Sequence, residues 1–264
     1  MKLHYYLFDP TGNITALIIS PAEKHLRQGA AKRVMENEPT CEQAGFVYLN
    51  EKNEPCLDMA GDEFCANASM SAAALRLIKY GKNKKKTQTI SLKVSGQSAP
   101  VNVTVQRKSE NDFLCEIRLS QPKNITEKRF CFNSRVFTFP TVEFDGITHI
   151  IAPKGILIKN EAENAVKLWC EELGAQALGI MFFDENEKTM DPLVYVPEAD
   201  TLFWESSCAS GSCAVGAYLS QKISGKVKVS LSQPGGALTV EAENKGEVTL
   251  SGTVKLLKEE VTDI

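Results

Sequence analysis

The sequence predicts an α+β fold made of two similar halves, each a mixed or antiparallel sheet around a central buried helix. Short strand-like segments dominate the chain, and two nearly apolar helical segments interrupt them. Each helical segment follows a cysteine in a similar motif, Cys65-Ala66-Asn67-Ala68-Ser69 and Cys208-Ala209-Ser210-Gly211-Ser212. The motifs lie about half the chain apart, so the repeated unit is a whole domain rather than a solenoid repeat.

The predicted strands are short runs that are rich in β-branched or aromatic residues and bounded by turn residues. They lie at residues 14–20, 45–50, 89–95, 101–106, 113–119, 149–152, 179–183, 193–196, 227–231 and 248–256.

Four helices are expected between these strands. Ser20-Pro21-Ala22-Glu23 has the pattern of a capping box with proline at the first helical position, and this helix should end before Pro39. Residues 161–173 carry apolar side chains at close to helical period. The helices at 67–80 and 210–222 begin with small residues and are apolar on most faces, which is typical of helices buried on most faces.

Each half contains a cysteine, a buried helix and then a β-hairpin. We place the first α+β half, with Cys65, at residues 1–119, and the second, with Cys208, at residues 120–264. The last strand of the chain could complete the first half. Features that match between two such halves are expected to face each other across a shared cleft.

The composition excludes several kinds of partner. With 264 residues and a net charge of −3, the chain has a sizeable core and no overall positive field to attract nucleic acid. The basic run at residues 82–86 is expected to be a solvated turn. No signal peptide or membrane-spanning segment is visible, so we expect a cytoplasmic protein with no membrane partner. A homodimer is compatible with the sequence.

Cys65 and Cys208 are candidates for catalysis because of the helices that follow them. The first N–H groups of a helix lack internal partners, and the helix dipole adds positive charge there. Small residues let a ligand approach this backbone, so each helix start is suited to bind a carboxylate. The same field is expected to lower the pKa of a thiol.

Two thiols on opposite faces of one α-carbon suit an amino-acid racemase. One removes the α-proton and the other delivers a proton to the opposite face, in both directions. The helix ends would stabilise the developing charge on the carboxylate. The pattern therefore predicts a racemase or epimerase that acts on a small amino-acid substrate.

A structural role for these cysteines is the main alternative, because a cysteine before an alanine-rich helix is commonly a small core residue. The pattern alone favours neither reading. The remaining cysteines lack such a context and are expected to fill the core or strands. Cys208 and Cys213 are not spaced as zinc ligands, and we expect no metal site.

The two motifs resemble those of the diaminopimelate epimerases. Cys65-Ala66-Asn67-Ala68 is similar to their Cys-Gly-Asn-Gly element, and Glu205-Ser206-Ser207-Cys208-Ala209-Ser210-Gly211 to their Glu-Arg…Ala-Cys-Gly-Thr/Ser-Gly element. Pro234-Gly235-Gly236 and Thr11-Gly12-Asn13 resemble two further elements. The resemblance implies two pseudo-symmetric α+β domains that each contribute one catalytic cysteine, with no metal, pyridoxal phosphate or other cofactor.

The resemblance also implies roles for individual residues. Cys65 and Cys208 would be the acid and base. The substrate carboxylate would be bound at the two helix starts by Ala66, Asn67, Ala209 and Ser210. Asn13 and Gln43 would line the cleft, and Glu205 and His149 would orient or polarise the thiols. Without the resemblance, a histidine in a strand such as His149 is more often structural.

Departures from the epimerase pattern bear on the substrate. Ser206 stands where diaminopimelate epimerases carry an arginine, and Ile147 and Met59 stand where they carry asparagines. A pocket for a second carboxylate does not lose such partners without cost, because a buried unpaired charge is unfavourable.

The motifs are more similar to those of histidine racemases that serve opine-type metallophore synthesis. This resemblance extends through Cys41-Glu42-Gln43-Ala44-Gly45-Phe46 and Gln233-Pro234-Gly235-Gly236. We therefore expect interconversion of L- and D-histidine. Diaminopimelate epimerase activity and a non-catalytic amino-acid-binding role are the alternatives.

Overall fold

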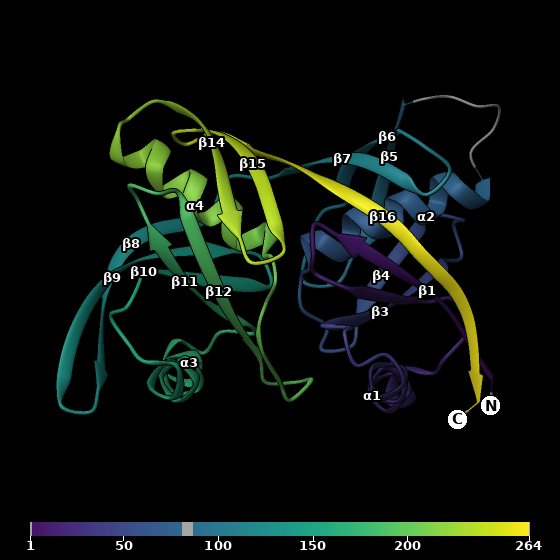
Figure 1. The fold of residues 1–264 in the computed structure, drawn as a ribbon, viewed down its shortest axis with the longest axis horizontal. Coiled ribbons are helices and arrows are strands. Elements are labelled where there is room, and N and C mark those ends of the chain that lie inside the picture. The colour runs from purple at the N-terminus through teal and green to yellow at the C-terminus, as the bar shows by residue number, and fades with distance from the viewer. Residues whose placement is uncertain (1, 81–86, 264) are drawn as a thin grey trace. The chain divides into compact units, whose positions relative to one another are not determined.

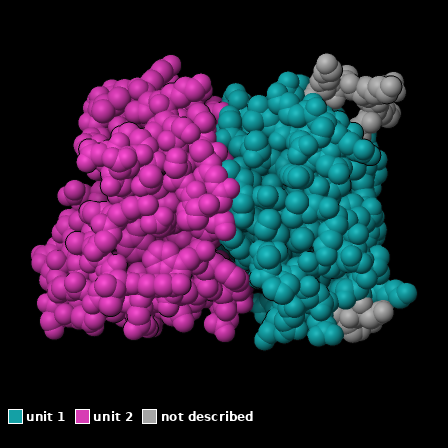
Figure 2. Space-filling view, viewed as in Figure 1, with its two compact units in different colours: residues 1–118, 251–264 teal, residues 119–250 magenta. Residues whose placement is uncertain are grey.

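The computed structural model describes residues 2–80 and 87–263, so the basic run at residues 82–86 lies outside the described residues. The chain divides into two compact units (Figure 2). Unit 1 contains Met1–Arg118 and Ser251–Ile264, and unit 2 contains Leu119–Leu250. The long strand β16 (Val248–Asp263) begins in unit 2 and ends in unit 1 (Figure 1).

Unit 1 is built on a ring of eight strands within the described residues. Their order is β1-β2-β3-β4-β5-β6-β7-β16, and β16 pairs back to β1, which closes the ring into a barrel. The pairs β2–β3 and β4–β5 are parallel. Besides β16, the strands are β1 (Lys2–Pro10), β2 (Thr15–Ile18), β3 (Gln43–Leu49), β4 (Pro55–Met59), β5 (Thr87–Val94), β6 (Val101–Arg107) and β7 (Asp112–Leu119).

Helix α2 (Ala66–Tyr80) packs against strands β1, β2, β5 and β6. Every residue of α2 from Ala66 through Leu75 is buried, as its small apolar sequence predicts. Helix α1 (Arg27–Asn37) packs on β2 and β3, where Ala30, Ala31 and Val34 join the core of this unit.

The start of α1 differs from the prediction. Residues 21–23 are not helical; a 3₁₀ turn, η1 (Lys24–Leu26), precedes α1. The predicted capping box at Ser20 is wrong because its hydroxyl accepts a hydrogen bond from the backbone N–H of His4, at 2.7 Å. The side chain therefore joins strand β1 rather than capping a helix.

Unit 2 contains a sheet with the order β15-β14-β12-β11-β10-β9-β8, and β13 pairs with β12. The pairs β10–β11 and β12–β14 are parallel. The strands are β8 (Asn124–Phe132), β9 (Arg135–Phe144), β10 (Ile147–Pro153), β11 (Leu178–Asp184), β12 (Thr189–Val196), β13 (Thr201–Trp204), β14 (Lys226–Gln233) and β15 (Gly236–Glu243).

Two helices accompany this sheet. Helix α3 (Lys159–Leu173) places the fully buried Trp169 against Phe130, with ring centroids 5.0 Å apart. Helix α3 ends at Gly174, whose φ of 59° is the left-handed conformation that glycine adopts readily. Helix α4 (Ala209–Lys222) packs against β9, β10, β11, β14 and β15.

The mixed α+β class is confirmed, and every predicted strand overlaps an observed one. Several strands were not predicted: β1, β4, β8, β9, β13 and β15. Among the described residues, no helix combines the length and apolar character needed to cross a membrane.

Candidate active site

Cys65 lies immediately before α2, at the helix start that the sequence predicted. Its Sγ accepts a hydrogen bond from the backbone N–H of Ala68, at 3.3 Å. Its carbonyl oxygen accepts from Ser69 N at 3.0 Å and from Ser69 Oγ at 2.7 Å. The thiol therefore occupies the capping position of the helix, beside N–H groups of the first turn.

A chain of amide hydrogen bonds leads to this thiol. Cys65 Sγ donates to Gln43 Oε1 at 2.9 Å, and Gln43 Nε2 donates to Asn13 Oδ1 and, at 3.0 Å, to Thr15 Oγ1. Asn13 is fully buried, and its Nδ2 donates to Glu42 Oε2 at 3.0 Å. These contacts fix the Gln43 amide with its carbonyl toward Cys65, so the predicted residues Asn13, Gln43 and Cys65 form one cluster.

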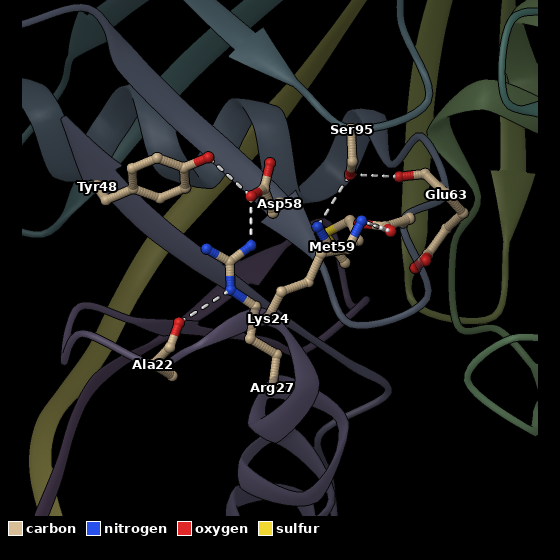
Figure 3. A network of polar contacts seen from close by, with 9 residues as sticks. Ala22, Lys24, Arg27, Tyr48, Asp58, Met59, Glu63 and Ser95 are labelled. Atoms are coloured by element: carbon tan, nitrogen blue, oxygen red, sulfur yellow. Dashed lines mark hydrogen bonds and ion pairs between the residues drawn. The ribbon is translucent and has the colours of Figure 1, made fainter. Parts of the chain in front are cut away.

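The loop between β4 and Cys65 is held at several points (Figure 3). Ser95 Oγ donates to the carbonyl oxygen of Glu63 at 2.7 Å and accepts from Met59 N at 2.9 Å. On the other side of Met59, Asp58 pairs with Arg27 (Figure 3). These contacts fix both ends of the segment that positions Cys65.

The Glu63 carboxyl in this loop is itself buried. Burial raises its pKa to about 7, although backbone N–H groups of Glu63 and Gly61 donate to it and oppose the rise. Its Oε2 atom has no hydrogen-bond partner among the residues that the structure describes.

Cys208 caps α4 in the same manner. Its Sγ accepts from the backbone N–H of Gly211 at 3.4 Å, and its carbonyl oxygen accepts from Ser212 Oγ at 2.7 Å. Gln233 Oε1 accepts from Cys208 N at 2.7 Å, while Gln233 Nε2 donates to Ser212 Oγ at 3.0 Å. A single side chain from the end of β14 thus binds the Cys208 backbone N–H and the Ser212 hydroxyl at the two ends of this capping turn.

The expected lowering of the thiol pKa is wrong for Cys208. Burial and the neighbouring Glu205 carboxylate, which also accepts a hydrogen bond from the thiol, raise the Cys208 pKa well above its usual value. The Gly211 N–H and the Ser210 hydroxyl act in the opposite direction but are outweighed. Cys208 is therefore a protonated thiol, and the Glu205 carboxylate accepts its hydrogen bond.

His149 lies on β10 and is completely buried. Its Nε2 is 3.0 Å from Ser210 Oγ, and Ser210 Oγ is 3.7 Å from Cys208 Sγ. Burial lowers the pKa of His149 to about 3, so the imidazole is neutral at physiological pH. The predicted residues His149, Glu205, Cys208 and Ser210 thus form a second cluster, within unit 2.

Two glycines lie against this second cluster, and their lack of a side chain makes room for neighbouring residues. A Cβ atom on Gly179 would lie 2.4 Å from His149 Nδ1, and one on Gly211 would lie 2.0 Å from Met181 Sδ. Real Cβ atoms do not approach other atoms this closely, so neither position accepts a larger residue without movement of its neighbours.

The other predicted carboxylate-binding residues lie in the first turns of the two helices. Ala66 and Asn67 in α2 and Ala209 in α4 are all at most 2% exposed. Three further residues at the site were not predicted from the sequence, namely Gln233, Glu42 and Thr15. Gln233 and Glu42 do belong to the motifs that resemble those of histidine racemases. Within residues 2–80 and 87–263, no group of three or more His, Cys, Asp or Glu side chains is arranged to hold a metal ion.

Comparison with known proteins identifies the family. The family described as "Histidine racemase CntK N-terminal domain" matches residues 2–259. A histidine racemase of Fusobacterium nucleatum is 32% identical over 263 residues, which cover 97% of this chain and 95% of the relative. A histidine racemase of Staphylococcus aureus is 26% identical over 276 residues, which cover 96% of this chain and 97% of the relative.

Solved structures share the fold at low sequence identity. A hydroxyproline epimerase from Agrobacterium vitis, with bound trans-4-hydroxy-L-proline, has a TM-score of 0.71 at 11% identity over 99% of this chain and 92% of that one. A phenazine biosynthesis family protein from Bacillus anthracis has a TM-score of 0.68 at 14% identity over the whole of both chains. The match to the family description over nearly the whole chain shows that this protein belongs to the histidine racemase family, which confirms the resemblance predicted from its cysteine motifs.

Proposed function

We propose that this chain interconverts L- and D-histidine, with Cys65 and Cys208 as the paired acid and base. Membership of the histidine racemase family supports the reaction. One structural observation supports the roles of the thiols. Each caps a buried helix and accepts an N–H from the residue three positions later, at 3.3 Å for Cys65 and 3.4 Å for Cys208.

The helix starts would bind the substrate carboxylate. The first N–H groups of α2 and α4, including those of Asn67 and Ser210, belong to the turns that carry unsatisfied donors and the positive end of the helix dipole. Fixed donors of this kind stabilise the negative charge that moves onto the carboxylate when the α-proton leaves. The small residues Ala66 and Ala209 would allow the carboxylate to come close.

Proton transfer would begin from two protonated thiols. Cys65 donates to Gln43, and Cys208 lies beside Glu205. We propose that Glu205 accepts the Cys208 proton when the positively charged substrate ammonium enters, because a nearby cation favours the thiolate. The thiolate then removes the α-proton of one enantiomer, and the Cys65 thiol protonates the opposite face. The reverse reaction exchanges the two roles.

We further propose that units 1 and 2 are pseudo-symmetric domains, each formed around its buried helix. The order of elements supports this, because both α2 and α4 follow a capping cysteine and precede a β-hairpin. We propose a cytoplasmic enzyme that acts on a free amino acid, with no nucleic-acid or membrane partner and with no bound cofactor. A homodimer remains compatible with this proposal.

Racemisation of histidine and epimerisation of diaminopimelate should be compared under identical reducing conditions. Ser206, Ile147 and Met59 offer no charged partner for a second carboxylate, so kcat/KM for histidine should exceed that for diaminopimelate by ~10²-fold or more. Equal turnover would assign diaminopimelate epimerase activity instead. Binding of L-histidine without formation of D-histidine would indicate an amino-acid-binding protein.

A further inference from the structure

A large groove in unit 1 is not part of the candidate active site. It has a volume of about 880 Å³ and is lined by the segment around η1, by β3 and β4, and by the last turns of α2. Ala22, Arg27 and Tyr48 belong to its lining (Figure 3). The volume falls in the range of about 300–1,000 Å³ that is usual for small-molecule sites.

The groove is bordered by large apolar side chains that remain exposed. Leu26, Tyr48, Leu49 and Tyr80 line it, and they are 47%, 39%, 41% and 59% exposed. Isolated exposed side chains of this kind are ordinary, but four of them around one concavity mark a binding surface. Buried apolar side chains, including that of Phe46, continue this surface into the groove.

Two cations, Arg76 and Lys79, line one side of the groove. Arg76 and Lys79 lie three residues apart on α2 and therefore on the same helix face. The Arg76 guanidinium carbon lies 4.0 Å from the centre of the Tyr80 ring, and Lys79 Nζ lies 4.8 Å from that of Tyr6. Among the described residues, neither lies within ion-pair distance of a carboxylate oxygen, although Lys79 also favours the charged form of the Glu259 carboxylate.

Two further charged side chains, Arg27 and Glu23, belong to the lining. Arg27 pairs with Asp58 and lies over the Phe46 ring. Glu23 is 78% exposed and lies 3.4 Å from His25 Nδ1. An occupant of the groove would therefore meet apolar walls, the positive charges of Arg76 and Lys79 on the α2 side, and one exposed carboxylate, Glu23, on the η1 side.

We propose that this groove binds a small organic anion with an apolar aromatic or aliphatic body. The body would lie between Leu26, Tyr48 and Leu49, and the anionic group would lie between Arg76 and Lys79. Arg76 is ten residues beyond Ala66 on α2, a rise of about 15 Å, so this site is separate from the Cys65 thiol.

A small ligand fits these observations better than a protein partner does. A stable protein interface engages roughly 20–30 residues on each side and resembles a broad surface. Here the exposed apolar surface is confined to four side chains around a concavity. The two cations also lie on one face of one helix, which suits a single anionic group.

The proposal can be tested with two fluorescent probes of similar shape. The first is 8-anilinonaphthalene-1-sulfonate, which is anionic, and the second is N-phenyl-1-naphthylamine, which is its uncharged counterpart. We expect one molecule of either probe to bind per chain. Arg76→Ala together with Lys79→Ala should weaken binding of the anionic probe about tenfold, since two partly exposed charge contacts are lost. Binding of the uncharged probe should change less than about twofold.

A second variant tests the shape of the groove rather than its charge, and a control variant removes a cation elsewhere. Ala22→Trp should fill the groove and prevent binding of both probes. Lys167→Ala removes a cation that lies 5.7 Å from the Tyr195 ring in unit 2, and it should leave both affinities unchanged. Binding of the anionic probe that is unaffected by both groove variants would overturn the proposal. It would also be overturned if the unmodified chain sedimented as a dimer that Ala22→Trp converts to monomers, since a second copy would then occupy the groove.

Discussion

Glu63 should make the stability of the protein depend on pH. Burial raises the pKa of its carboxyl from 4.5 to about 7, so between these values the folded chain retains a proton that the unfolded chain releases. Its contribution to stability is fully present below pH 4.5 and is lost as pH rises through 7. At about 1.4 kcal/mol per pKa unit, the loss amounts to about 3 kcal/mol.

Glu63→Gln removes this titration and keeps a carbonyl oxygen that can accept from the backbone N–H groups of Gly61 and residue 63. Between pH 4.5 and pH 8, the unmodified chain should lose about 3 kcal/mol more unfolding free energy than the variant. Over the same pH range, the Tm of the unmodified chain should fall by roughly 6–12 °C more than that of the variant, at about 2–4 °C per kcal/mol for a chain of this size. Glu116→Gln, at an exposed position of β7, controls for the loss of a carboxylate. Identical pH profiles for Glu63→Gln and the unmodified chain would refute the reasoning.

Three further substitutions test the packing around the site and in the units. Gly179→Ala places a Cβ 2.4 Å from His149 Nδ1, so it should move the imidazole away from Ser210 and lower kcat for histidine by at least about tenfold; normal turnover would separate His149 from catalysis. Gly29→Ala lies in the first turn of α1, and no atom lies within 4 Å of the new Cβ. It should stabilise the chain by about 0.5–1 kcal/mol in chemical denaturation, and a loss of stability would show that the position does not accept a Cβ. Trp169→Ala should destabilise unit 2 by about 3–5 kcal/mol, measured in the same way, because it empties the space beside Phe130; a change under about 1 kcal/mol would contradict the packing described for α3.

Local sequence was sufficient where one segment determines its own structure. Helices α2 and α4 begin within one residue of the predicted positions, because small apolar residues follow a capping cysteine in both. The capping box at Ser20 failed because its hydroxyl has a partner in another segment, the backbone N–H of His4. Local patterns do not reveal competition of this kind, which depends on how distant strands pair.

The chemistry of the site was predictable in part. The sequence motifs predicted Asn13, Gln43 and Cys65 as site residues, and in the structure hydrogen bonds connect these three side chains. They did not predict that Glu205 and burial would raise the Cys208 pKa, because the balance between a helix end and a buried carboxylate depends on distance and solvent exclusion. Gln233 was likewise missed, since its contact with Cys208 joins residues that lie far apart in sequence.

The most direct test of the two-thiol account is racemisation of L-histidine in heavy water, stopped at low conversion. A thiol carries one proton that exchanges with solvent, so D-histidine should contain deuterium at Cα from the first turnovers. The remaining L-histidine should keep its original hydrogen. Cys65→Ser and Cys208→Ser should each abolish formation of D-histidine, because a serine hydroxyl is too weak an acid to replace either thiol. Transfer of the original hydrogen into D-histidine, or near-normal turnover in either variant, would contradict the account.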